Sequence, residues 1–373
     1  MKEKATFDEN FWKSFSWFLL VVIVICILPW LLAKHAWIDF SSTGEIGDTI
    51  GGIMGPFVAI AAAGLTFVAF WVQYKANILQ RNDIATERLE AKYYKMLDIY
   101  SGITNGVVVH GVKGKEAFAE LTGEFTYTFY TIRKIFNDVV CGTDNIEKES
   151  NRQKALILEL QKDKKKRDEF LVKLAYNLFF YGQHYMVVDI PHPEYTELAE
   201  KIKQIGFQYN RTPIHSGRTF ADYVKSGYFE LDNFYNGFSS SLYEGHSDFL
   251  GHYFRHLFQM VKFVASMDDK LVNEETKYGY VKILRSQLSD YEQILLYYNS
   301  LTDQGAAWNK KHGDRFPEDA GYIARFRMIK NLPPNFPLFG VLPVNLYKED
   351  SKKWSKLGKE FYEHRYIPLA NDK

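Results

Sequence analysis

Residues 50–72 read IGGIMGPFVAIAAAGLTFVAFWV, an apolar run without a single charged side chain. A helix of this length is long enough to cross the ~30 Å hydrocarbon core of a lipid bilayer. The chain becomes polar at Gln73, and neither glycine nor proline interrupts it before Gly102, where we expect the helix to stop. The run therefore predicts a membrane span that continues directly into a juxtamembrane helix, as far as about Tyr100.

A second uncharged run lies closer to the N-terminus. Residues 15–33 read FSWFLLVVIVICILPWLLA, which as a helix would be about 28 Å long. A buried core helix and a cleaved signal peptide are the alternatives. Two such runs at one end of the chain argue against a buried core helix. The lack of a small-residue cleavage site before residues 50–72 argues against a signal peptide. We predict a two-helix transmembrane hairpin with spans at about 15–33 and 50–72.

The distribution of lysine and arginine predicts the orientation of this hairpin, because positive residues favour the cytoplasmic side of a membrane. Positive side chains precede the first span and follow the second, whereas residues 34–49 between them carry only Lys34. We therefore expect both termini in the cytoplasm and the bilayer as the first partner. The flanking positive residues are Lys2, Lys4, Lys13, Lys75, Arg81, Arg88, Lys92 and Lys95.

Small residues recur at every fourth position along the second span. Such a stripe allows close approach of helix backbones, which drives helix association in lipid. One interpretation is that the stripe packs against the first span of the same chain, and the other is homo-oligomerisation around a pore. The stripe consists of Gly47, Gly51, Gly55, Ala59 and Ala63.

Composition excludes several classes of protein. The 373 residues carry 46 Lys and Arg against 45 Asp and Glu, so no global basic field favours nucleic-acid binding. Two cysteines cannot build a disulfide framework or a thiolate zinc site. We predict a mainly α fold in three parts: a transmembrane hairpin (1–74), a helical juxtamembrane stalk (75–100) and an α-helical cytosolic domain (101–373).

Within that domain, apolar spacing and punctuation by glycine and proline predict a loop over 102–114, followed by a series of helices. The basic run KDKKKR at 162–167 falls inside one of them. It is typical of a solvated helix face, with contact to RNA or anionic lipid as the alternative. The predicted helices span 116–140, 151–181, 195–205, 251–267 and 278–300, with a further one from Lys348.

Four residues of metal-ligand type lie close together in the sequence: His246, Asp248, His252 and His256. His252 and His256 are four apart, as a metal pair on a helix requires, but Arg255 between them disfavours a divalent cation. We interpret these histidines as packing and capping residues. We predict neither a metal nor a cofactor.

A second polar group consists of Arg255, Arg285, Gln287, Glu292 and Asn299. If residues 278–300 form one helix, Arg285 and Glu292 lie two turns apart on one face. These charges either pair with neighbouring helices and fix their packing or hold an anionic ligand. The sequence contains neither a Gly-x-Ser-x-Gly nucleophile motif nor a dinucleotide fingerprint.

Two stretches resemble the phage abortive-infection family often called AbiC-like. They are GHYFRHLFQMVKFV at 251–264 and YVKILRSQLSDYEQILLYYNSL at 280–301. The two N-terminal spans and the segment around Tyr93, Tyr94, Met96 and Leu97 are similar to that family as well. The resemblance implies a role in antiphage defence at a bacterial inner membrane. It assigns no catalytic residue.

The residues that match the family motifs supply a candidate functional cluster. It consists of His252, Arg255, Arg285, Gln287, Glu292 and Asn299, together with Tyr253, Ser289 and Tyr298.

Three functions stay open. The first is a non-enzymatic effector whose cytosolic domain senses a phage-derived or defence-system protein or nucleic acid and perturbs the membrane. The second is a membrane-tethered RNase or nucleotide hydrolase. The third is a membrane scaffold that recruits or restrains a toxic partner. The sequence favours the first and leaves an enzyme open.

Overall fold

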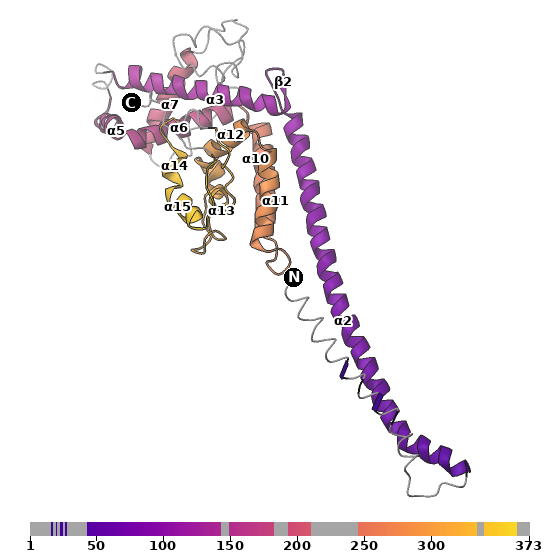
Figure 1. Ribbon diagram of the computed structural model, residues 1–373. Coiled ribbons are helices and arrows are strands. Elements are labelled where there is room, and N and C mark those ends of the chain that lie inside the picture. The colour runs from indigo at the N-terminus through magenta and orange to yellow at the C-terminus, as the bar shows by residue number, and fades with distance from the viewer. Residues whose placement is uncertain are drawn as a thin grey trace. The chain divides into compact units, whose positions relative to one another are not determined.

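The computed structural model describes residues 43–142, 149–182, 193–209, 245–333 and 339–363, with six isolated positions between 16 and 27. It confirms a mainly α fold (Figure 1). The elements are α2 (Thr43–Gly106), β1 (Val108–Val109), β2 (Val112–Lys113), η1 (Gly114–Glu116), α3 (Ala117–Lys134), the π-helical η2 (Ile135–Val140), α5 (Asn151–Lys162), α6 (Lys164–Tyr181), α7 (Pro193–Tyr209), α10 (Ser247–Ala265), α11 (Glu274–Gln287), α12 (Asp290–Ser300), η4 (Asp303–Trp308), α13 (Tyr322–Phe326), α14 (Pro343–Leu346) and α15 (Lys348–Lys356).

Helix α2 is a single element of 64 residues that contains the predicted second span and the polar segment after it. By length and composition its apolar part is a candidate membrane span, and none of that part is buried. The predicted stop at Gly102 is wrong, because one glycine weakens a helix without ending it. The helix ends at Gly106, where Val107 is buried and its carbonyl accepts a hydrogen bond from Gly114.

The predicted first span, residues 15–33, lies outside the described residues except for the six isolated positions. The structure therefore gives one candidate span, and the two-helix hairpin stays a prediction. Contacts divide the chain into two units, Met1–Glu87 and Arg88–Lys373, with the boundary inside α2.

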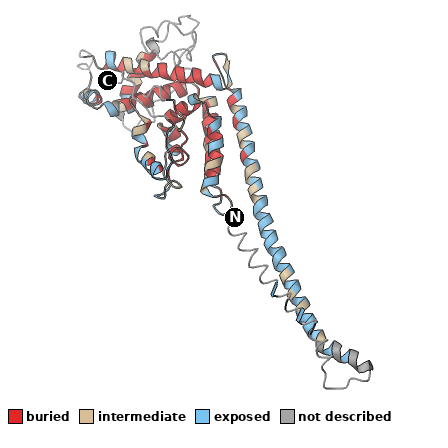
Figure 2. Cartoon of the chain, in the orientation of Figure 1, coloured by how far each residue is buried: buried red, intermediate tan, exposed pale blue. Residues whose placement is uncertain are grey.

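The second unit is built around α3, which is buried on almost every side and packs against α6, α7 and α12. Figure 2 shows buried residues throughout the helices of this unit, whereas most of α2 is exposed. Three threonines inside α3 are satisfied within the helix: the hydroxyls of Thr122, Thr126 and Thr128 each donate to the carbonyl four residues earlier. The core is therefore helical and rich in packed aromatic rings, such as Phe129 stacked on Phe339.

The predicted helix over 278–300 is wrong in one respect, because the structure divides it into α11 and α12. The break follows from a capping box. The Ser289 hydroxyl accepts from the Glu292 amide at 3.3 Å, and Glu292 Oε2 accepts from the Ser289 amide at 2.7 Å. Arg285 and Glu292 therefore lie on different helices.

The predicted helix over 151–181 is likewise two helices, α5 and α6. Asp163 separates them, since its side chain accepts a hydrogen bond from the Lys166 amide and caps α6. In addition, the predicted loop over 102–114 contains a short antiparallel hairpin, in which Val108 pairs with Lys113.

The capping box predicts a measurable contribution to stability. Ser289→Ala should lower the free energy of unfolding by about 1 kcal/mol, because α12 loses the acceptor for its Glu292 amide. Urea titration of the full chain in detergent, followed by circular dichroism, measures this.

Ser286→Ala is the matched control for this change. Ser286 is exposed, and its hydroxyl donates only within α11, to the Ile283 carbonyl. We expect its free energy of unfolding to stay within about 0.5 kcal/mol of the wild type. Equal losses in the two variants would contradict the role assigned to Ser289.

Candidate functional site

The six residues of the candidate functional cluster fall into two groups in the structure. Arg285, Glu292 and Asn299 are buried, with 6%, 0% and 2% of their surface exposed. The others, His252, Arg255 and Gln287, are exposed. The buried members have definite partners that show what each does.

Glu292 joins three helices. Its Oε1 accepts a hydrogen bond from the Tyr100 hydroxyl of α2 at 2.6 Å and another from the Tyr253 hydroxyl of α10 at 2.9 Å. Its Oε2 accepts from the Ser289 amide at the start of α12. The positive end of the α12 dipole also favours a carboxylate at this position. A single carboxylate therefore fixes the end of α2 to α10 and α12.

The two tyrosines around Glu292 stay protonated. Burial raises the pKa of Tyr100 and that of Tyr253 well above 10, and the Glu292 charge raises both further. Both hydroxyls are therefore donors at physiological pH.

Two more contacts hold the same end of α2. The Tyr93 hydroxyl donates to the Tyr280 carbonyl at 2.6 Å, and the Tyr280 hydroxyl donates to Glu90 Oε1 at 2.6 Å. One turn further along α2, the Met96 carbonyl lies 2.8 Å from Nε2 of His256.

We call Tyr253, His256, Tyr280 and Glu292 the α2 clamp. Glu292, His256 and Tyr280 bond to α2 on successive turns between Glu90 and Tyr100, and the Tyr253 ring packs against the Tyr100 ring with 5.9 Å between centroids.

Arg285 and Asn299 hold other parts of the second unit. Arg285 Nη1 donates to the Phe326 and Arg327 carbonyls at 3.0 and 3.1 Å, where Arg327 ends α13 in a left-handed conformation. Asn299 donates to the Tyr176 hydroxyl of α6 at 3.1 Å. Arg285 and Glu292 thus have separate partners and do not pair with each other.

A further buried group, which no sequence motif predicts, centres on Glu124 of α3. Its Oε2 lies 2.9 Å from Nε2 of His246 and 3.3 Å from Nε2 of His110 in the hairpin turn. Glu124 and His246 are 122 residues apart in the chain, so no local motif could have predicted this pairing. The group ties α3 to the hairpin and to the start of α10.

Charge stabilises this group. Burial alone would raise the pKa of Glu124, but the imidazoles of His246 and His110 outweigh burial and lower the pKa below its usual 4.5.

The histidines considered as metal ligands have different neighbours. His246 faces Glu124, His256 faces the Met96 carbonyl and His252 is exposed. Within the described ranges, no group of three or more ligand-type side chains is arranged to hold a metal ion.

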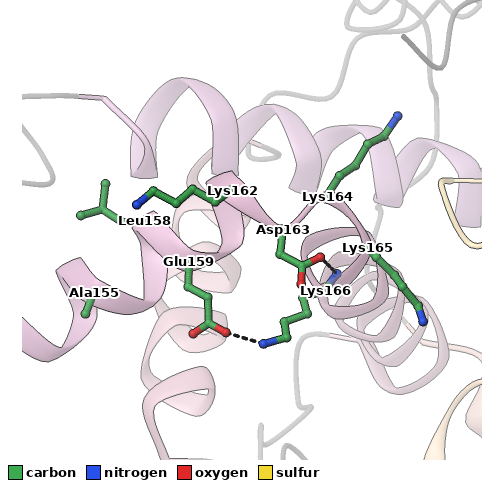
Figure 3. Close-up of a pocket in the computed structure, with 8 residues that line it drawn as sticks. All are labelled: Ala155, Leu158, Glu159, Lys162, Asp163, Lys164, Lys165 and Lys166. Atoms are coloured by element: carbon green, nitrogen blue, oxygen red, sulfur yellow. Dashed lines mark hydrogen bonds and ion pairs between the residues drawn. The ribbon is translucent and has the colours of Figure 1, made fainter.

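Residues 162–166, most of the basic run at 162–167, line an open hollow on the surface between α5 and α6 (Figure 3). Lys166 lies 2.5 Å from Glu159, and Lys165 lies 3.9 Å from Glu169. These side chains are exposed, so the run is a solvated and partly ion-paired surface. Contact with RNA or anionic lipid there stays a prediction.

The small-residue stripe lies on the exposed part of α2. Gly51, Gly55, Ala59 and Ala63 are exposed, and a Cβ added at Gly51 or Gly55 would meet no atom within 4 Å. The side-chain surroundings of Gly47 lie outside the described residues.

These features define an α-helical protein in which a core of helices holds the end of a long, partly apolar helix. Residues 245–337 match the family model described as "Putative phage abortive infection protein". The matched segment, about a quarter of the chain, includes α10 to α13 and all four residues of the α2 clamp. Nothing matches the chain among curated proteins or among solved structures.

The Glu124 group predicts a pH-dependent stability. A carboxylate whose pKa is lower in the folded chain stabilises the fold above the unfolded pKa, and this contribution disappears as the pH falls through the folded pKa. Glu124→Gln should therefore lower the free energy of unfolding by roughly 1–3 kcal/mol at pH 7. The difference from wild type should shrink as the pH falls below 4.5.

Urea titrations at several pH values measure this difference. Glu116→Gln is the control, because Glu116 is exposed just before α3, and we expect it to change stability little at any pH. A Glu124→Gln deficit that stays constant with pH would show that charge is not the cause.

Proposed function

We propose that this protein is a membrane-anchored antiphage effector that acts by abortive infection. The family match over 245–337 supports the defence role. The observation that carries the mechanism is that this matched segment contains the α2 clamp, while α2 itself carries the candidate membrane span. The segment with the family resemblance is thus the part that holds the membrane helix.

In this mechanism the second unit senses an infection cue, either a protein or a nucleic acid, in the cytoplasm. Binding of the cue shifts α10 and α12, and the α2 clamp passes that shift to the end of α2. Because a continuous helix is stiff along its axis, movement at Tyr100 reaches the apolar residues of the same helix. The spans then reorganise and perturb the inner membrane, which arrests the infected cell.

We further propose that the small-residue stripe mediates association of the spans, including association between copies of the chain. Its exposed backbone is available for close approach by another helix. The two-span topology with both termini in the cytoplasm belongs to the same proposal, supported by the distribution of positive residues.

Leucine on the stripe tests this function. Gly51→Leu combined with Gly55→Leu should abolish protection, because the added side chains prevent close helix approach in lipid. Phage should then plate as efficiently as on cells without the protein. The measurement is plating efficiency at matched protein levels in the membrane, with a phage that the wild type restricts.

Gly64→Leu is the control, because nine residues after Gly55 the helix has turned by about 180° and Gly64 faces away from Gly55. Protection should survive in this variant. Full protection by the double stripe variant would refute membrane perturbation through the stripe.

A further inference from the structure

Glu292 is a buried negative charge that is satisfied by hydroxyl and amide donors instead of a cation. Its donors come from Tyr100, Tyr253 and Ser289, on three different elements. Within the part of the chain that the structure describes, no lysine, arginine or histidine forms an ion pair with it. The charge is therefore stable only while these elements stay together.

We propose that the Glu292 carboxylate acts as a latch. It holds the end of α2 docked against the core, and its release of Tyr100 is the regulated step that frees α2 to move. This inference rests on the proposed function, in which movement of α2 reaches the membrane. It assigns the control of that movement to one carboxylate and two tyrosine hydroxyls.

The latch has two states because water cannot replace the hydrogen bond from Tyr100 to Glu292 while α2 is docked. Tyr100 is 2% exposed and Glu292 is fully buried, so water has no access to the carboxylate while α2 is docked. A buried charge that loses a donor without gaining water is strongly disfavoured. The end of α2 is therefore either docked with the bond intact or undocked with both groups hydrated.

The remaining contacts of the α2 clamp make release cooperative. Tyr93 and Tyr100 are seven residues apart and thus lie on the same face of α2, with the Met96 carbonyl between them. Tyr93 is fully buried and donates to the Tyr280 carbonyl, and His256 contacts Met96. Undocking at Tyr100 exposes this face and weakens the neighbouring contacts.

Amide hydrogen exchange on the full chain in lipid nanodiscs tests the latch. Tyr100→Phe removes the donor and keeps the ring, so exchange over residues 96–106 should accelerate by about ten- to a hundredfold. Tyr94→Phe is the matched control, because Tyr94 lies on the same helix and is 48% exposed. We expect exchange in this variant to equal that of the wild type.

Tyr347→Phe separates a latch from general loosening of the core. The Tyr347 side chain is buried and its hydroxyl donates to Asn309 Oδ1 at 2.7 Å, so this variant also loses a hydrogen bond of the core, but not one to Glu292. Global stability should fall, whereas exchange over 96–106 should equal that of the wild type. Acceleration in both variants, or in neither, overturns the latch.

The exchange measurement is independent of phage. If exchange confirms the latch but cells with the Gly51→Leu/Gly55→Leu variant still resist phage, the latch is supported and the proposed function is refuted. Unchanged exchange in Tyr100→Phe removes the latch whatever the plating assay shows.

Discussion

The Glu292 carboxylate has no contact with water, so the protein itself must satisfy its charge. Tyr100 and Tyr253 do so from two helices, and the Ser289 amide does so at the start of a third. The same side chain also caps α12, which separates that helix from α11. One carboxylate therefore sets the boundary of a helix and attaches the end of α2 to the core.

This attachment gives the family-matched segment a physical role. Residues 245–337 contain buried structural residues such as Arg285. They also contain the α2 clamp, and the residues of α2 that the clamp holds lie outside the match. The proposed mechanism uses this attachment to pass a change from one end of α2 to the other. Abortive infection by membrane perturbation follows from this arrangement as a proposal, because the apolar part of α2 is a candidate span.

Local features were predictable from the sequence, and contacts between distant residues were not. The apolar run at 50–72 and its polar continuation predicted most of α2, apart from residues 43–49 before the run and residues 103–106 after the expected stop at Gly102. Ser289 and Glu292 carried a capping signal that would have divided the 278–300 helix correctly. By contrast, Glu124 meets His246 across 122 residues and Tyr100 meets Glu292 across 192, and no local spacing encodes such pairs.

The most direct test of the account is the inner-membrane potential of infected cells, followed with a voltage-sensitive dye from phage addition to lysis. Uninfected cells that express the protein, and infected cells without it, are the controls. The account predicts depolarisation before lysis only when protein and phage are both present. An intact potential in cells that nonetheless stop producing phage would contradict it and show that the spans serve only as an anchor.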